Sequence, residues 1–401
     1  MDIIVLMELE KIIKANQEAR KLSQIDIRDF ALRNSFKWSN DFLKEVLNQY
    51  QILKKMATKL PQWHTNENVL GASLLNMEQC SSESVSTYKF KRLNGKSAVD
   101  LTGGFGVDTY HLSKKFNKVT YCETNKPLFD IVKYNFKALG VTNVNFLNIS
   151  AEEFLETTNL QFDLIYLDPD RRNEDNKKLV LLHNLSPNLI DINELLLSKA
   201  QKTLVKLSPI LDISQAAKQV KGLQSVEILA QKNEVKELIF AFNKIGTEAD
   251  LSIQATQLGP DKIETFTFNR EDEVQAKPFY SEPKKYLYEP NAAIMKAGGF
   301  KLVSVKYNLG KISRHSHYYT SENLISNFQG KGFQVNEVKP FSSKAMKGFK
   351  NDQFNILSRN FPMKPETIAQ KYRLKKGGER YLIFTQNHKN EKIILSCVRT
   401  F

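Results

Sequence analysis

The sequence predicts an α/β fold built on a parallel sheet. Between residues 97 and 206, short apolar runs of strand length alternate with longer stretches of helical periodicity. Alternation at this spacing is typical of a doubly wound sheet whose parallel strands are joined by helices. Two later apolar runs are separated by only a short polar connection, which predicts a hairpin with one antiparallel strand at the end of the sheet.

The predicted sheet has seven strands, at Ala98–Leu101, Val119–Cys122, Val144–Leu147, Leu164–Leu167, Thr203–Lys206, Val226–Leu229 and Glu237–Phe242. Helices are predicted between the first five of them, at Val107–Lys115, Pro127–Leu139, Ala151–Thr157 and Leu189–Ala200. Each strand is short and followed by polar or glycine residues. Because the carboxyl ends of parallel strands meet at one edge, those residues are the first place to look for a site.

Residues 1–90 are predicted to form an N-terminal helical region. Their apolar residues recur every three or four positions, as at Leu43, Val46, Leu47 and Tyr50. Ser39 stands at the start of this segment, where a hydroxyl can cap a helix. We expect a domain at residues 91–250 to follow, containing the sheet.

The sequence after the sheet predicts a C-terminal α+β region. Alternating segments within residues 251–270, such as Glu264–Asn269, indicate strands, whereas Glu322–Phe328 has helical periodicity. Further strands are predicted at Lys301–Tyr307, Gly332–Val338, Tyr381–Thr385 and Lys392–Cys397. We expect two domains here, at residues 251–320 and 321–401.

The composition favours a globular cytoplasmic protein. Hydrophobic residues make up 41% and charged residues 25% of the 401 positions, and no apolar run approaches the roughly 20 residues that span a bilayer. The three cysteines are scattered, which supports neither a disulfide framework nor a zinc site. His315 and His317 form an isolated His-x-His motif with no further candidate ligands in the sequence, so no metal site is predicted.

Positive charge is concentrated in the last third of the chain. From Ala276 to Phe401 there are 23 Lys and Arg against 8 Asp and Glu, a net of +15, whereas residues 1–275 have a net of −1. Such a concentration is typical of a surface that binds a polyanion, most often nucleic acid. Cations stand beside aromatic residues here, which suits contact with phosphates and stacking on bases. The candidate substrate contacts are Lys284, Lys285, Arg314, Lys375 and Lys376.

A glycine-rich loop follows the first predicted strand. It reads Asp100-Leu-Thr-Gly-Gly-Phe-Gly106, and its glycines allow a ligand to approach the backbone closely. Thr109 replaces the third glycine of the dinucleotide fingerprint, which argues against a pyrophosphate site. The methionine part of S-adenosylmethionine would need only the free amides of the loop, with Asp100 attracting its ammonium group.

Two more strand ends place polar groups beside this loop. Glu123 ends the second strand, 23 residues after Asp100, a spacing that suits a carboxylate for ribose hydroxyls. Ser150, after the third strand, could contact an adenine edge or cap the helix that begins at Ala151. The strand ends together predict a nucleoside cofactor, for which S-adenosylmethionine fits best.

The fourth strand is followed by Asp168-Pro-Asp-Arg-Arg172, which should emerge at the same edge of the sheet. Asp168, with the carbonyls that Pro169 leaves free, can hold an amino group while its nitrogen attacks a methyl group. Arg171 and Arg172 offer forked donors to a phosphate or a base. Methyl transfer needs mainly alignment and exclusion of water, because the sulfonium is already activated.

These motifs resemble those of the class I S-adenosylmethionine-dependent methyltransferases. More narrowly, the chain is similar to the bacterial family in which a ferredoxin-like segment and a C-terminal THUMP-like domain follow the methyltransferase domain. The resemblance covers residues 60 to 400. Besides the loops above, it is carried by Glu78–Glu83, Lys206–Pro209, Tyr288–Ala292, Arg359–Pro362 and Gly377–Tyr381. It implies a Rossmann-like, seven-stranded methyltransferase sheet and S-adenosylmethionine as the cofactor.

The resemblance also implies roles for individual residues. Together with the strand ends, it gives the candidate cofactor contacts Gln79, Asp100, Thr102, Gly103, Gly104, Gly106, Glu123 and Ser150, and a reactive loop made of Asp168, Pro169, Asp170 and Arg171. The chain departs from the class at two places. Thr102 replaces the usual first glycine, and Asp170 and Arg171 replace the proline and the aromatic residue of amino-group methyltransferases.

The predicted function is methyl transfer from S-adenosylmethionine to nucleic acid, with a base in structured RNA (tRNA or rRNA) as the expected target. THUMP-type domains are associated with RNA binding, which agrees with the basic last third. Two alternatives stay open: a non-catalytic RNA-binding or assembly protein that retains the fold, and a methyltransferase for proteins or small molecules. No membrane partner is expected, and the sequence does not indicate an oligomeric state.

Overall fold

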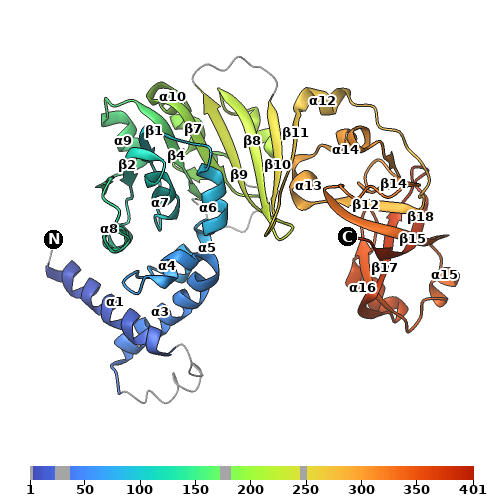
Figure 1. Cartoon of the computed structure of the whole chain (residues 1–401), viewed down its shortest axis with the longest axis horizontal. Coiled ribbons are helices and arrows are strands. Elements are labelled where there is room, and N and C mark those ends of the chain that lie inside the picture. The colour runs from blue at the N-terminus through green and yellow to red at the C-terminus, as the bar shows by residue number, and fades with distance from the viewer. Residues whose placement is uncertain (1–2, 23–36, 172–181, 244–250) are drawn as a thin grey trace. The chain divides into compact units, whose positions relative to one another are not determined.

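The computed structural model describes residues 3–22, 37–171, 182–243 and 251–401. The chain divides into two compact units, one of residues 1–224 and 239–248 and the other of residues 225–238 and 249–401. The larger sheet has nine strands and a second sheet has seven (Figure 1). In the described ranges, no helix combines the length and the apolar character needed to cross a membrane.

The first unit begins with the predicted helical region. Helix α1 (Ile3–Lys21) packs against α3 (Asn40–Lys59), and α4 (Pro61–Thr65), α5 (Leu74–Gln79) and α6 (Glu83–Phe90) follow (Figure 1). Ser39 caps α3 as predicted, because its hydroxyl accepts the N–H of Phe42 at 3.3 Å. Pro61 occupies the first turn of α4, where the missing N–H costs no helical hydrogen bond.

The larger sheet contains all seven predicted strands and two more. Its strands are β1 (Gly95–Asp100), β2 (Phe116–Cys122), β3 (Val144–Leu147), β4 (Phe162–Leu167), β7 (Ala200–Leu207), β8 (Leu223–Gln231), β9 (Glu234–Asn243), β10 (Ser252–Leu258) and β11 (Ile263–Asn269), in the order β11-β10-β8-β9-β7-β4-β1-β2-β3. From β7 through β4, β1 and β2 to β3, neighbouring strands are parallel. The connecting helices are α7 (Val107–Ser113), α8 (Lys126–Ala138), α9 (Ala151–Thr157), α10 (Leu189–Lys199) and α11 (Ile213–Ala217).

The prediction of seven strands is wrong by two. β10 pairs in parallel with β8, and β11 pairs with β10 in the antiparallel sense, so both extend the same sheet. The alternating pattern after residue 250 predicts strands correctly but does not indicate which sheet they join. The predicted hairpin forms through Lys232 and Asn233, whose φ angles of 53° and 57° match the two-residue turn that joins adjacent antiparallel strands.

The second sheet lies in the basic part of the chain. Its strands are β12 (Tyr286–Pro290), β13 (Gly310–Lys311), β14 (Tyr319–Ser321), β15 (Gly330–Pro340), β16 (Gln353–Ser358), β17 (Lys375–Gln386) and β18 (Lys392–Arg399), in the order β13-β14-β12-β15-β18-β17-β16. Pairing is antiparallel except between β16 and β17. Ile383 and Phe384 belong to two different buried clusters, as expected for neighbouring residues that point to opposite faces of a strand.

Two predicted elements of this region are wrong. Lys301–Tyr307 forms most of α14 (Phe300–Tyr307) rather than a strand, because the Glu273 carboxylate accepts the N–H groups of Lys301 and Leu302 at 2.8 to 3.1 Å and so caps the helix from a distant segment. Glu322–Phe328 contains no helix. Tyr288 holds this segment instead, since its hydroxyl accepts the N–H of Ile325 at 2.8 Å.

The remaining helices of the second unit are short and lie between its strands. They are α12 (Arg270–Gln275), α13 (Ala292–Ala297), α15 (Ser343–Lys347) and α16 (Pro365–Tyr372). The predicted strands at 332–338, 381–385 and 392–397 lie within β15, β17 and β18.

Candidate cofactor and active site

The carboxyl ends of β1, β2 and β4 open into one cavity of about 490 Å³, which we call the strand-end cavity. Ten of the predicted residues line it: Gln79, Asp100, Thr102, Gly103, Gly104, Gly106, Glu123, Ser150, Asp168 and Asp170. Pro169 is buried directly beside them. The backbone of Arg171 belongs to β5 (Asp170–Arg171), which pairs with β6 (Leu185–Ser186). The side chain of Arg171 and all of Arg172 lie outside the described part of the chain.

The loop after β1 needs its glycines. A Cβ atom on Gly103 would lie 2.0 Å from the Tyr121 ring, and Gly106 has a φ of 81°, with Val132 2.7 Å from any added Cβ. The loop is further fixed by the Tyr121 hydroxyl, which donates to the carbonyl of Gly104 at 2.8 Å. The loop is therefore pressed against β2 on one side and faces the strand-end cavity on the other.

Asp100 is buried in the cavity, with 1% of its surface exposed. Its carboxylate accepts the backbone N–H of Thr102 at 3.1 Å and the hydroxyl of Thr109 at 2.7 Å. Burial raises the pKa of Asp100 to about 7, and the nearby Asp108 carboxylate acts in the same direction, although the two hydrogen bonds favour the charged form. Asp100 thus changes charge near neutral pH.

Glu123 and Ser150 lie at the next two strand ends. The Glu123 carboxylate accepts the N–H of Gly104 at 3.0 Å and that of Asn125 at 2.7 Å, which holds it at the rim of the cavity. Ser150 caps α9, because its hydroxyl accepts the N–H of Glu153 at 3.1 Å, and it also lines the cavity. Both roles considered for Ser150 are therefore compatible with its position.

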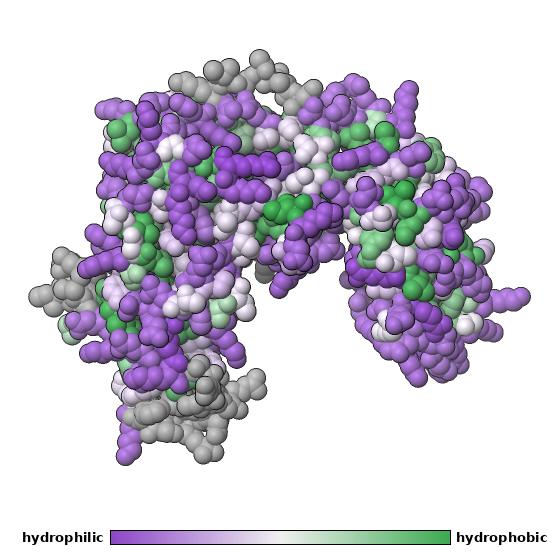
Figure 2. Space-filling view, in the orientation of Figure 1, coloured by the Kyte–Doolittle hydropathy of each residue, from purple (hydrophilic) through white to green (hydrophobic). Residues whose placement is uncertain are grey.

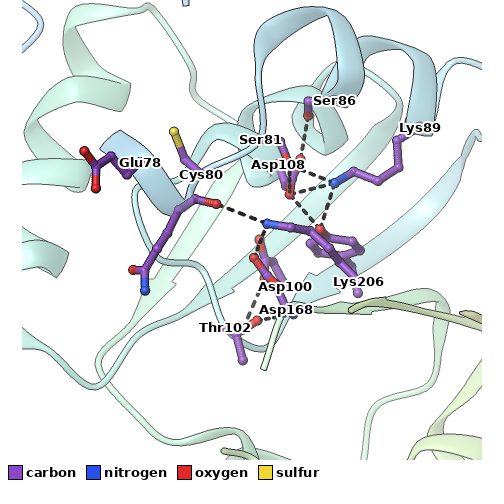
Figure 3. Close-up of polar contacts among 12 residues, drawn as sticks. Glu78, Cys80, Ser81, Ser86, Lys89, Asp100, Thr102, Asp108, Asp168 and Lys206 are labelled. Atoms are coloured by element: carbon purple, nitrogen blue, oxygen red, sulfur yellow. Dashed lines mark hydrogen bonds and ion pairs between the residues drawn. The ribbon is translucent and has the colours of Figure 1, made fainter. Parts of the chain in front are cut away.

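Asp168 is held at two points. Its backbone N–H donates to the hydroxyl of Thr102 at 2.6 Å, and its carboxylate forms an ion pair with Lys206 at the end of β7 (Figure 3). Desolvation raises the pKa of Asp168 to about 6, although Lys206 favours the charged form. Desolvation also raises the pKa of Asp170, again against the effect of Lys206.

Lys206 is a site residue that the sequence indicates only as part of the Lys206–Pro209 motif, without a role of its own. It lies at the carboxyl end of a predicted parallel strand, so the rule that located Asp168 could also have located it. Its ammonium contacts the backbone carbonyl of Gln79 at 3.4 Å as well as Asp168 (Figure 3). Lys206 therefore links the segment before β1 to the reactive loop.

A second ion pair is buried in the wall of the cavity, which its Asp108 lines. Lys89 (1% exposed side chain) contacts Asp108 at 2.9 Å, and Ser81, Ser86 and Tyr166 donate to the same carboxylate at 2.6 to 3.0 Å (Figure 3). We call these five residues the Lys89 cluster. Burial alone would raise the pKa of Asp108, but Lys89, Lys206 and the hydroxyl donors hold it well below its ordinary value. The cluster joins α6, α7 and β4 and supports the segment at Gln79 that lines the cavity.

The strand-end cavity is acidic. Its described lining contains the carboxylates of Asp100, Asp108, Glu123, Glu152, Asp168 and Asp170 and one cation, Lys206. A cationic ligand with an ammonium group, hydroxyls and an apolar part suits this set of groups, because the carboxylates accept from donors and attract positive charge. S-Adenosylmethionine has these features, so the residues fit the predicted cofactor.

The five predicted substrate contacts of the basic last third belong to the second unit and are not among the residues that line the cavity. Lys284 and Lys285 precede β12, Arg314 lies in the loop after β13, and Lys375 and Lys376 begin β17. Lys284 is 3.9 Å from Glu322, whereas the other four residues are exposed. Figure 2 shows hydrophilic side chains over most of the face in view.

Comparisons with known proteins agree with this organisation. Residues 82–229 match the family described as conserved hypothetical protein 95, residues 286–328 match a ferredoxin-like domain, and residues 330–399 match a THUMP-like domain. The crystal structure of a proposed methyltransferase from Porphyromonas gingivalis W83 is similar over 98% of this chain and 99% of that one, with a TM-score of 0.87 and 29% sequence identity.

A curated relative matches a smaller part of the chain. The tRNA/tmRNA (uracil-C(5))-methyltransferase of Neisseria meningitidis is 30% identical over 105 residues, which are 22% of this chain. The match spans only 29% of the length of that relative. The domain matches, and the similarity to the Porphyromonas structure over almost the whole chain, agree with each other. The chain is thus similar to methyltransferases in which a ferredoxin-like segment and a THUMP-like domain follow the methyltransferase domain.

Proposed function

We propose that this protein transfers a methyl group from S-adenosylmethionine to a base of a structured RNA, such as a tRNA or an rRNA. The observation that carries the proposal is the strand-end cavity, where six carboxylates and one lysine of the described lining surround a glycine loop. A cavity of this charge favours a cationic ligand, and its place at the carboxyl edge of a parallel sheet suits a nucleoside.

Each predicted residue has a role in this proposal. Asp100 would attract the ammonium group of the cofactor, Glu123 would accept from its ribose hydroxyls, and the backbone of Gly103 and Gly104 would lie against it. When bound, S-adenosylmethionine supplies an activated methyl group on its sulfonium. The glycine loop and the segment at Gln79 both line the cavity, and they would shield this group from water.

The reactive loop would receive the acceptor base. Asp168 faces the cavity with 36% of its side chain exposed, so a substrate N–H or O–H can reach its carboxylate. With a pKa of about 6, this carboxylate is ionised at neutral pH and can take up a proton that the acceptor releases as its new bond to carbon forms. The assignment of Asp168 as the proton acceptor thus rests on the accessibility of its carboxylate and on its negative charge.

RNA as the substrate is supported by the charge of the last third. Its net of +15 contrasts with the net of −1 of the first 275 residues, and a polyanion offers the complementary charge. The THUMP-like match lies within this part, and the Neisseria relative is named for action on tRNA and tmRNA. The proposal places the protein in the cytoplasm, where its three free cysteines stay reduced.

Two measurements test the proposal in sequence. Isothermal titration of the purified, ligand-free protein with S-adenosylmethionine and with its demethylated product should give binding of both; no binding would reject the cofactor. Mass spectrometry of modified nucleosides, in cells with and without the protein, should reveal one methylated nucleoside that depends on it. Unchanged RNA despite confirmed cofactor binding would favour a protein or small-molecule substrate, or a non-catalytic RNA-binding role.

A further inference from the structure

We propose that Thr102 and Lys206 position Asp168 from two directions, so that its carboxylate is fixed beside the cofactor loop before a substrate arrives. This inference rests on the proposed function and names the residues that place its reactive group. Neither residue would touch the reacting atoms in this scheme, so both are positioning residues.

Thr102 fixes the backbone of the reactive loop. Its hydroxyl accepts the N–H of Asp168 at 2.6 Å, and its own N–H donates to the buried Asp100 carboxylate at 3.1 Å. Asp100 is held in turn by Thr109. A glycine at position 102, which is usual in the methyltransferase class, would lack the hydroxyl and could not bond to Asp168 in this way. The departure at Thr102 therefore adds a direct link between the cofactor loop and the reactive loop.

Lys206 fixes the side chain of the same residue. It is anchored in β7, 11% of its side chain is exposed, and its ammonium pairs with Oδ2 of Asp168. Among the described residues, the hydrogen bonds of this carboxylate involve Oδ2 only. A carboxylate has about four positions that can accept hydrogen bonds, so Oδ1 stays able to accept from a substrate.

The two interactions together supply preorganisation. If the loop became ordered only during the reaction, the entropy cost of ordering its backbone and side chain would lower the rate. A loop that is already ordered avoids this cost. Lys206 adds a charge effect, because an ammonium beside a carboxylate favours the ionised form that can accept a proton. If the two interactions only stabilised the fold, their loss would lower stability without changing the order of the reactive loop or the pH dependence of turnover. A positioning role and a purely structural role can therefore be distinguished by experiment.

Matched variants separate the two interactions. Thr102→Val removes the hydroxyl at nearly constant shape, and Thr102→Ser keeps it. Lys206→Met removes the ammonium, and Lys206→Arg keeps a cation. Lys118→Met, at an exposed position of β2, controls for the loss of one positive charge. Circular dichroism and thermal unfolding establish that each variant is folded.

Amide hydrogen exchange of the ligand-free protein tests the anchoring without any need for activity. The peptide spanning residues 164–170 should exchange at least several-fold faster in Thr102→Val than in wild type, whereas Thr102→Ser and Lys118→Met should stay slow. Lys206→Met should also exchange faster in this peptide, and Lys206→Arg should exchange more slowly than Lys206→Met. Equal exchange in Thr102→Val and Thr102→Ser would overturn the role of Thr102, and equal exchange in Lys206→Met and wild type would overturn the role of Lys206.

The pH dependence of turnover tests the consequence for the reaction. Because Lys206 favours the charged form of Asp168, its removal should move the acid limb of the rate profile upward by about one to three pH units. Lys206→Arg should restore the limb toward its original position. A lower rate with an unmoved limb would indicate a merely structural role and overturn this part. A protein that binds the cofactor but methylates no RNA would reject the proposed function, while the exchange data would still decide the anchoring.

Discussion

The two parts of the chain use charge in opposite ways. In the first unit, two ion pairs lie in the wall of the acidic strand-end cavity, Lys89 with Asp108 and Lys206 with Asp168. In the basic last third, Lys285, Lys375 and Lys376 are exposed. Paired charges in the wall of a cavity hold a site in shape, whereas exposed cations of one sign attract a polyanion over a distance. In the proposed function, the cofactor and the nucleic acid would therefore be recognised by separate means.

The largest expected effect is at the centre of the acidic cavity. Asp168→Ala should lower turnover by about 10²- to 10⁴-fold, because a positioned carboxylate that accepts a proton contributes on that order. Binding of S-adenosylmethionine should be largely retained, since the glycine loop and Glu123 are untouched. Steady-state rates with RNA and titration calorimetry measure the two effects. Wild-type turnover in Asp168→Ala would remove this residue from the proposed mechanism.

The second effect concerns the paired charges of the Lys89 cluster. Lys89→Met should lower the free energy of unfolding by about 3–5 kcal/mol, because it leaves the Asp108 carboxylate buried without its ammonium partner. Urea denaturation monitored by circular dichroism measures the change. Lys221→Met breaks an ion pair with Glu194 in which both side chains are 78% exposed, and it should leave the unfolding curve unchanged. Similar losses in both variants would contradict the distinction between buried and exposed charge.

A smaller effect is expected in the basic part. Lys375→Ala combined with Lys376→Ala should weaken RNA binding about tenfold and reduce the slope of log affinity against log salt by about two, one for each phosphate that the variant no longer neutralises. Binding of S-adenosylmethionine should not change. Removal of the exposed Lys96 and Lys118 of the first unit provides the control and should leave RNA affinity near that of wild type. An equal loss of affinity in the control would place the RNA surface elsewhere.

The smallest effect is the pH dependence of cofactor binding. The pKa values of Asp100 and Asp168, about 7 and about 6, lie above the ordinary range for aspartate. As the pH rises through this interval both carboxylates become ionised, so the affinity for cationic S-adenosylmethionine should increase, by roughly 3- to 10-fold between about pH 5.5 and 8. The demethylated product lacks the sulfonium charge and should respond less. Parallel calorimetric titrations measure the difference, and an affinity for the cationic form that falls with rising pH would contradict the proposed attraction.

The sequence predicts the sheet better than it predicts the elements around it. The seven strands of the methyltransferase sheet are recognisable because each is a short apolar run followed by polar residues or glycine. Lys301–Tyr307 has a strand-like pattern, yet it forms α14 because Glu273 caps it from 28 residues away. Such an interaction depends on the folded arrangement and leaves no local pattern. For the same reason, β10 and β11 are predictable as strands but not as part of the larger sheet.

The candidate site likewise contains residues that the sequence predicts and residues that it does not. Asp100, Glu123 and Asp168 follow predicted strands, so the topology brings them together. The Lys89 cluster joins Lys89 to Asp108 and to Tyr166, which are 19 and 77 positions away, and no spacing in the sequence predicts that pairing. The sequence gives Thr102 as a candidate cofactor contact and as a departure from glycine, but it does not indicate a link to Asp168. Its hydrogen bond with Asp168 explains the departure through the folded structure.

The central claim is that one protein combines an acidic cofactor cavity with RNA as the methyl acceptor. The most direct test incubates the purified protein with S-adenosylmethionine that carries a tritiated methyl group and with total RNA from cells lacking the protein. Wild-type protein should transfer label to RNA, and ribonuclease treatment should remove the labelled band or fraction. Asp168→Ala should transfer at most about one hundredth as much label. Label found only in protein or small molecules, or no label despite measured cofactor binding, would contradict the claim.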